Sequence, residues 1–333
     1  MKKILTTALL CIFSFNAVLA EENKKPFVKE HKEHKHKINL VNAAVYQQIK
    51  DFGAVYNTSH LFFEYNIDVS QLLFLNASLS FGDGITNKLN EKNYSISSTA
   101  DDLESYLKDI NNTGRKYILE FYYQKSFENF VFIGGLIDST AFIDTNNYAN
   151  DEHTQFLNSA FVNNPIAVLP SYNLGVYLKY KFNEDNSLSA VFMDNSPEDD
   201  NVFITEYEME KDFYGFRIFG FQTTKTSQNG IGISADYTFN GNLGLFFRGG
   251  YSNTDYNVFL SLGFEKFKII LDKDSIGLAY GFINGKGYTR DINIAEIFYE
   301  VNPKDFIAIT FDVQYMKEVN EDFIFGARLY LSY

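Results

Sequence analysis

The chain has 333 residues, a formal net charge of −13 and one cysteine. An acidic balance argues against nucleic acid as a partner and against an anion-selective channel, and one cysteine excludes a disulfide framework. Aromatic residues are 17% of the chain, with 34 Phe and 23 Tyr, yet no apolar run after residue 20 is near the length of a transmembrane helix.

Residues 1–20 have the features of a secretory signal: two lysines, an apolar core and a small-residue cleavage site that ends at Ala20. The apolar run is too short for a membrane-anchoring helix. Cys11 lies within it, so the mature chain has no thiol-based site. Removal of the two lysines would take the net charge from −13 to −15. An exported, aromatic-rich chain without an apolar helix points to an outer-membrane β-barrel, because hydrocarbon requires every backbone polar group to be paired internally.

Residues 21–37 form a charged, His/Lys/Glu-rich stretch without apolar periodicity, which we interpret as a solvated periplasmic leader. Its histidines and glutamates could instead hold a divalent metal, although such short tracts are only compositional signals. They are His31, His34, His36, Glu30 and Glu33.

Residues 38–333 are predicted to form the barrel. Residues 38–59 fit either a helical face or a weak first strand, whereas 60–69 clearly alternate apolar and polar side chains. This is the dyad pattern of lipid-facing and lumen-facing residues. Further strands are predicted near 73–81, 116–125, 129–138, 172–183, 187–194, 212–222, 230–240, 242–251, 256–264, 266–272, 275–283, 291–301, 305–315 and 322–333.

Fifteen strands are legible, and because single-chain bacterial barrels have even numbers, 38–59 should supply the sixteenth. Long links at 82–113, 139–171, 195–211 and 284–290 would all lie at one end, as long extracellular loops do. A short helix is expected at 99–110, and a bulge at Ala295-Glu296. Residues 194–212 are expected to be an acidic loop, whose carboxylates form a solvated extracellular face or share a calcium ion.

The stretch from Gly134 to Tyr172 begins as a strand and then follows neither the helical nor the strand period from 139 to 171. Its apolar residues argue against disorder, so a run of this length is either functional or an ordinary Asn-rich surface loop. Carboxamides both donate and accept hydrogen bonds without net charge, which suits a neutral, hydroxyl-rich solute, and aromatic faces could cover the apolar side of a sugar ring. The asparagines are Asn146, Asn147, Asn150, Asn158, Asn163 and Asn164.

The same stretch resembles a known family. GGLID, then FID and FLNSAF, together with the upstream TGRKYILEFYYQKSF, are similar to the central block of the carbohydrate-selective porins of the OprB family, over about Asn112 to Tyr180. The resemblance implies a 16-stranded transmembrane outer-membrane barrel whose third extracellular loop folds inward and narrows the pore. The family is associated with an Arg-containing constriction, and this chain has only five arginines.

We therefore expect passive, substrate-selective diffusion of mono- and small oligosaccharides. A general, weakly cation-preferring diffusion porin is the alternative, and a surface adhesin or receptor is a third. An enzyme is disfavoured, because pairing His60 with Glu64 or His153 with Ser139 gives no recognisable motif. No catalytic residue, cofactor or metal is assigned. The candidate pore-lining residues are Arg217, Arg248 and Arg328 as donors, Glu120 as acceptor, Asp138 and Asp144, and Phe156, Asn158, Phe161, Asn163 and Asn164 at the neck.

The chain ends GARLYLSY, with Leu329, Leu331 and Tyr333 on one face. This ending looks like the C-terminal recognition signal that outer-membrane barrels present to the barrel assembly machinery. The expected partners are thus carbohydrate solutes, outer-membrane lipid and that machinery, with no nucleic acid. The working unit is expected to be a monomer or a homotrimer.

Overall fold

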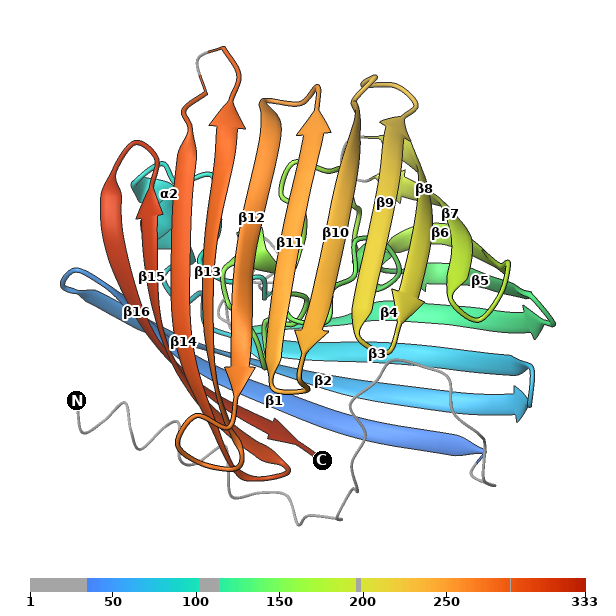
Figure 1. Ribbon diagram of the computed structural model, residues 1–333, viewed down its shortest axis with the longest axis horizontal. Coiled ribbons are helices and arrows are strands. Elements are labelled where there is room, and N and C mark those ends of the chain that lie inside the picture. Colours follow the sequence, from blue (N-terminus) through green and yellow to red (C-terminus); the bar gives the residue numbers. More distant parts are fainter. Residues whose placement is uncertain (1–34, 102–113, 196–198, 288) are drawn as a thin grey trace.

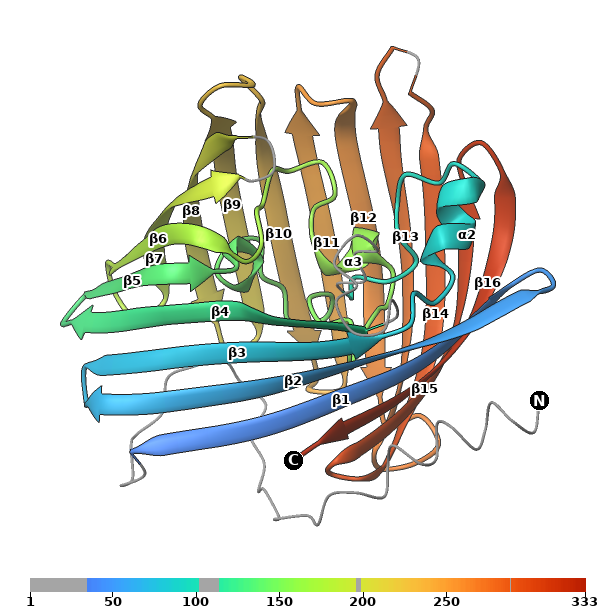
Figure 2. The same ribbon diagram turned by 180° about the vertical axis from the view of Figure 1, so that it is seen from behind.

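The computed structural model describes residues 35–101, 114–195, 199–287 and 289–333. Sixteen antiparallel strands form a closed barrel in which each strand pairs with its neighbours in sequence (Figures 1 and 2). The predicted fold class and strand number are confirmed. The strands are β1 (His36–Ile49), β2 (Phe52–Asp68), β3 (Gln71–Phe81), β4 (Gly114–Phe127), β5 (Phe130–Ile137), β6 (Asn173–Lys181), β7 (Asn186–Asn195), β8 (Asp200–Lys211), β9 (Tyr214–Thr223), β10 (Asn229–Phe239), β11 (Leu243–Ser252), β12 (Tyr256–Phe267), β13 (Asp274–Gly285), β14 (Ile292–Lys304), β15 (Ile307–Lys317) and β16 (Glu321–Ser332).

The ring closes where β1 pairs with β16 over Val41 to Ile49. Leu40 and Tyr333 extend this pairing by exchanging both backbone hydrogen bonds, at 2.9 and 2.8 Å. The ambiguous region 38–59 therefore contains β1 and the start of β2, and its helical interpretation is wrong. Apolar residues four apart on β1, such as Val41 and Val45, fit a strand face as well as a helical one.

Two errors in the predicted strand list offset each other. The expected acidic loop at 194–212 is mostly β8, and its glutamates face the barrel interior, where Glu206 is only 2% exposed. The expected strand at 266–272 is instead the end of β12 and the turn that follows it. In that turn the Asp274 carboxylate accepts the N–H groups of Ile269, Ile270 and Leu271. Those three apolar residues have strand-like composition but no strand partner.

The expected bulge at Ala295-Glu296 is also wrong. The pairing of β13 with β14 continues without a register shift from Asp274 opposite Val301 to Ile283 opposite Ile292. The apparent change of phase has another cause. Ile292, Ile294 and Phe298 point inward and are 0 to 1% exposed, so apolar side chains stand beside Glu296 on an inner face that a water-filled lumen would make polar throughout.

Side chains on alternate positions of each strand face inward and outward, as the pleat requires. Outward residues form an exposed apolar belt, and inward residues pack into two large buried clusters together with residues from the long connections. No helix in the described ranges is long and apolar enough to cross a membrane.

The two long connections that hold the site, 82–113 and 138–172, leave the barrel at the same end, because exactly two strands separate them. The expected long link at 195–211 reduces to residues 196–199. The described part of the first connection contains the helix α2 (Thr86–Glu91). The helix expected at 99–110 falls mainly on residues 102–110, outside the described ranges. The signal and most of the leader also lie outside them; His36 and Lys37 belong to β1.

Candidate functional site

Residues 138–172 lie against the inner wall of β8 to β16 (Figure 2). They contain two short helical pieces, η2 (Ser139–Ala141) and α3 (Ser159–Val162). Asp138 caps the first by accepting the N–H of Thr140 at 2.9 Å. Most of the segment is irregular, so its backbone polar groups need partners from side chains of the wall. Charged side chains of the wall hold the segment at four places, directly or through another side chain.

The first is Arg248 on β11, which is 0% exposed. Its guanidinium donates to the carbonyls of Ala149, Phe161 and Asp144, the last two at 2.6 Å, and to Oδ1 of Asn150. Its Nε lies 3.2 Å from the Asp144 carboxylate. One arginine thus holds three separate turns of the segment.

Asp144 is the centre of this contact. Its Oδ2 accepts the N–H of Asn164 and its own N–H donates to Glu206, both at 2.8 Å. Complete burial raises the pKa of Asp144, although Arg248 and the N–H of Asn164 oppose the rise. The carboxylate therefore depends on Arg248 for its charge.

The second place is Glu296 on β14, which accepts the backbone N–H groups of Leu157 and Asn158 at 2.7 and 2.9 Å. The third is Arg328 on β16, which donates to the carbonyls of Glu152 and Gln155. A carboxylate that accepts and a guanidinium that donates therefore fix opposite kinds of backbone group within a few residues.

The fourth place is a charge network on β8 to β10. Arg217 lies 2.7 Å from Asp236 and 3.4 Å from Glu208, and it reaches the segment only indirectly, because Asp236 accepts the carboxamide of Asn147 at 2.6 Å. Lys179 also lies 2.5 Å from Glu208.

The predicted neck residues lie where residues 138–172 meet the inner wall. Asn158 donates to Gln314 at 2.9 Å and caps α3 through the N–H of Ala160. Asn164 donates to the carbonyl of Gly249. Phe156 and Phe161 are 0% exposed, and of the five predicted neck residues only Asn163 is partly exposed.

Glu120 and Asp138 lie elsewhere. Glu120 on β4 accepts the carboxamide of Asn76 at 3.2 Å, and Asp138 begins the segment just after β5. The structure therefore brings the three arginines and the neck residues to one side of the barrel and these two carboxylates to another.

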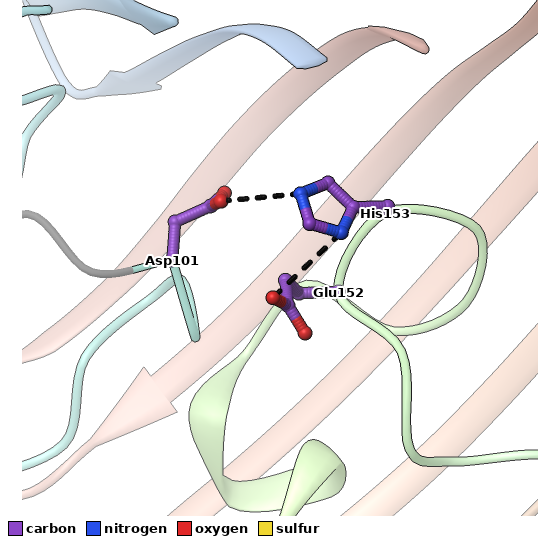
Figure 3. Close-up of side chains that lie close together, drawn as sticks. All are labelled: Asp101, Glu152 and His153. Atoms are coloured by element: carbon purple, nitrogen blue, oxygen red, sulfur yellow. Dashed lines mark ion pairs between the residues drawn. The ribbon is translucent and has the colours of Figure 1, made fainter. Parts of the chain in front are cut away.

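A histidine surrounded by carboxylates joins the two long connections (Figure 3). Nε2 of His153 lies 3.5 Å from Oδ1 of Asp101, and its Nδ1 lies 3.7 Å from Glu152 and 3.5 Å from Asp151. Burial opposes a charge on this imidazole, but the three carboxylates outweigh burial and raise the pKa of His153 well above its usual range. Burial also raises the pKa of Glu152, to about 7.

A row of aromatic rings follows the inner wall from β2 to β6. Successive ring centroids lie 4.6 to 6.3 Å apart, within the range of attractive ring contacts. Phe62 and Phe142 are partly exposed. The aromatic row comprises His60, Phe62, Phe74, Tyr122, Phe142 and Tyr177.

Four inward glycines mark where the segment meets the wall. A Cβ on Gly250 would lie 2.6 Å from Nδ2 of Asn164, and one on Gly244 would lie 2.1 Å from the Tyr148 ring. Gly232 and Gly281 contact Asn164 and Phe161 in the same way. Glycine inside a strand often marks such a close approach, so this signal was present in the sequence. The pairing of His153 with Asp101 had none, because the two residues are far apart in the chain.

Comparison with known proteins places the chain in a family. It is 37% identical over 310 residues to an uncharacterized protein of Aquifex aeolicus (strain VF5), an alignment that covers 92% of this chain and 98% of the relative. The chain belongs to the family of that Aquifex protein. No family model matches the sequence.

Among solved structures, the fold is similar to that of OprB of Pseudomonas putida at high pH, with a TM-score of 0.70 and 10% identity over 90% of this chain and 94% of that one. A triple mutant of the Rhodopseudomonas blastica porin gives a TM-score of 0.62 at 9% identity, over 90% of this chain and all of the other. At these identities the likeness concerns the fold: the chain is a porin-like barrel.

Proposed function

We propose that the protein is an outer-membrane porin through which mono- and small oligosaccharides diffuse passively, past a constriction made by residues 138–172. The exposed apolar belt supports a place in lipid, because outward side chains such as Leu262, Tyr280 and Phe311 are 46 to 58% exposed. The porin-like fold supports a channel, and the hydrogen bonds to the wall support a fixed constriction. Selectivity then comes from pore width and lining groups.

The observation that carries sugar selectivity is the aromatic row. Ring faces can cover the apolar side of a pyranose, while nearby polar groups bond its hydroxyls. Phe62 and Phe142 keep part of their surface exposed. Glu64, on the same inner face of β2, and Lys179 on β6 keep 14% and 24% of their side chains exposed, so charged partners for hydroxyls lie close to the row.

A planar-bilayer recording tests this proposal. Oligosaccharides should block the salt current of the wild-type channel, and the double substitution F62A/F142A should weaken the block by at least about tenfold, if each ring contributes about 1 kcal/mol. Phe63 faces outward on the same strand, so F63A is the matched control and should leave the block unchanged. Equal permeation of sugars and size-matched amino acids in liposome swelling would contradict sugar selectivity.

The alternative, a general and weakly cation-preferring porin, has one observation in its favour. Among the described inward positions, buried carboxylates outnumber cationic side chains; they include Glu120, Glu206, Asp236, Glu265, Glu296, Glu300, Asp312 and Asp322. Reversal potentials in a salt gradient distinguish the two functions, because a sugar channel needs no ion preference.

A further inference from the structure

We propose that His153, Asp101 and Glu152, together with His60 on the wall, bind one divalent transition-metal ion such as Zn²⁺. The site does not depend on which solute passes. One ligand atom each from Asp101, Glu152 and His153 lie within 4.8 Å of one another (Figure 3). Within the described residues, Nε2 of His153 is buried and has no hydrogen-bond partner. A metal ion there would take the place of the proton that the carboxylates hold on this imidazole, because a histidine ligand must be neutral.

The Asp101 carboxylate is held in place by hydroxyl groups. Tyr56 donates to its Oδ2 at 2.5 Å, Thr58 donates to its Oδ1 at 3.0 Å, and Thr99 lies 3.2 Å from Oδ2. Such outer hydrogen bonds orient metal ligands and strengthen binding. The side chain is 2% exposed, so its orientation is fixed before any ion arrives.

The His60 ring on β2 lies next to the His153 ring. Asn76 donates its amide to Glu120 at 3.2 Å, which turns its Oδ1 toward Nδ1 of His60 at 3.2 Å. Nδ1 must then carry the proton, and Nε2 keeps the lone pair that a metal needs. The His60 and His153 ring centroids are 5.6 Å apart, close to the separation of about 5 Å for two imidazoles on one tetrahedral zinc with Zn–N bonds of about 2.0 Å.

Charge also favours an ion here. Three carboxylates, Asp101, Asp151 and Glu152, surround one imidazole, and the neighbouring Arg328 donates to the carbonyl of residue 152 rather than to a carboxylate of the cluster. A divalent cation would balance the excess. Two imidazoles with carboxylates suit zinc and similar ions, whereas Ca²⁺ and Mg²⁺ prefer all-oxygen sets.

The ligands come from three parts of the chain: β2, the connection after β3, and residues 138–172. An ion would therefore join both long connections to β2. Binding that occurs only in the folded barrel adds stability in proportion to the logarithm of the free ion concentration.

The test must separate this site from the His-rich leader. In the full chain, folded in detergent and stripped of metal, we would replace the leader histidines with glutamine (H31Q, H34Q, H36Q) and titrate Zn²⁺ by calorimetry. This background should still bind one ion per chain. Adding H153Q or H60Q should weaken binding by at least about tenfold, while D199N, at an exposed carboxylate, should not. Unchanged binding in H153Q would overturn the proposal.

A second measurement covers the case in which a substitution prevents folding. X-ray absorption of Zn²⁺ bound to the leader-substituted background should show two imidazole nitrogens with oxygen ligands. A zinc site without imidazole, or no binding by this background, would overturn the proposal even if no cluster variant folds.

Discussion

Arg248 makes four hydrogen bonds to residues 138–172, twice as many as Glu296 or Arg328, so its replacement is the sharpest test of how that segment is held. R248M keeps much of the apolar stem but removes every donor. Four hydrogen bonds and the 3.2 Å ion pair with Asp144 are lost, and that carboxylate is left fully buried without a cation.

Breaking a buried ion pair by removing one partner costs about 3–5 kcal/mol, because the other charge is left uncompensated. Asp144 can limit the loss by taking up a proton, since burial already raises its pKa. The double variant R248M/D144N removes that charge and should recover about 1–3 kcal/mol, the cost of one unsatisfied buried group.

Two readouts separate local from global effects. Urea unfolding in detergent reports the stability of the barrel, and single-channel conductance reports the position of the segment. R248M should raise the conductance and its fluctuations. Because the segment can be released while the barrel stays folded, the urea midpoint of the barrel should fall by less than the full cost of the broken ion pair would predict. If R248M leaves both readouts at wild-type values, the arginine does not hold the segment and the reasoning fails.

Three further predictions concern the wall and the belt. E296A removes the acceptor of two backbone N–H groups and should destabilise the segment by about 2–4 kcal/mol, seen as larger open-channel noise; wild-type noise would contradict this. G250A places a Cβ 2.6 Å from the Asn164 carboxamide. It should lower the free energy of unfolding by about 1–3 kcal/mol, measured with urea, and a wild-type value would contradict this close approach. L262R puts a cation on the outward belt and should cost about 2–4 kcal/mol of folding free energy in lipid, whereas V319R in the β15–β16 turn should cost little; equal losses would argue against a lipid-facing belt.

Most strands could be predicted because alternation on strands such as β10 is unambiguous and pairing is between sequence neighbours. The total of sixteen is correct only because the missed β8 and the extra strand predicted at 266–272 cancel. The prediction failed on strands whose inner face mixes apolar and charged side chains. On β8 and β14, inward residues such as Val202 and Ile294 pack against the long connections, so the in-out pattern that marks a water-filled lumen disappears. A one-dimensional pattern cannot show what covers the inner face.

The contacts of the site could be predicted only in part, for the same reason. The three arginines face inward, as expected from the cost of a lipid-facing position. Arg248 and Arg328 donate mainly to backbone carbonyls, which have no sequence signature, whereas Arg217 pairs with Asp236 and Glu208. The inward glycines of β10 to β13 were the one available signal of where the segment would lie. The His153 cluster depends on a contact with Asp101 from another connection, and only the folded chain reveals it.

The burial of the arginines restricts how a sugar could be recognised. Arg248 and Arg328 are 0 and 2% exposed and already donate to carbonyls of the segment. A solute hydroxyl would have to displace those bonds and gain no more than they provide, since the net value of such a bond is about 0.5–3 kcal/mol. Recognition should therefore use groups that keep exposed surface, namely Phe62 and Phe142 with Glu64 nearby. It follows that arginine variants should change channel width, whereas aromatic variants should change sugar block at constant conductance.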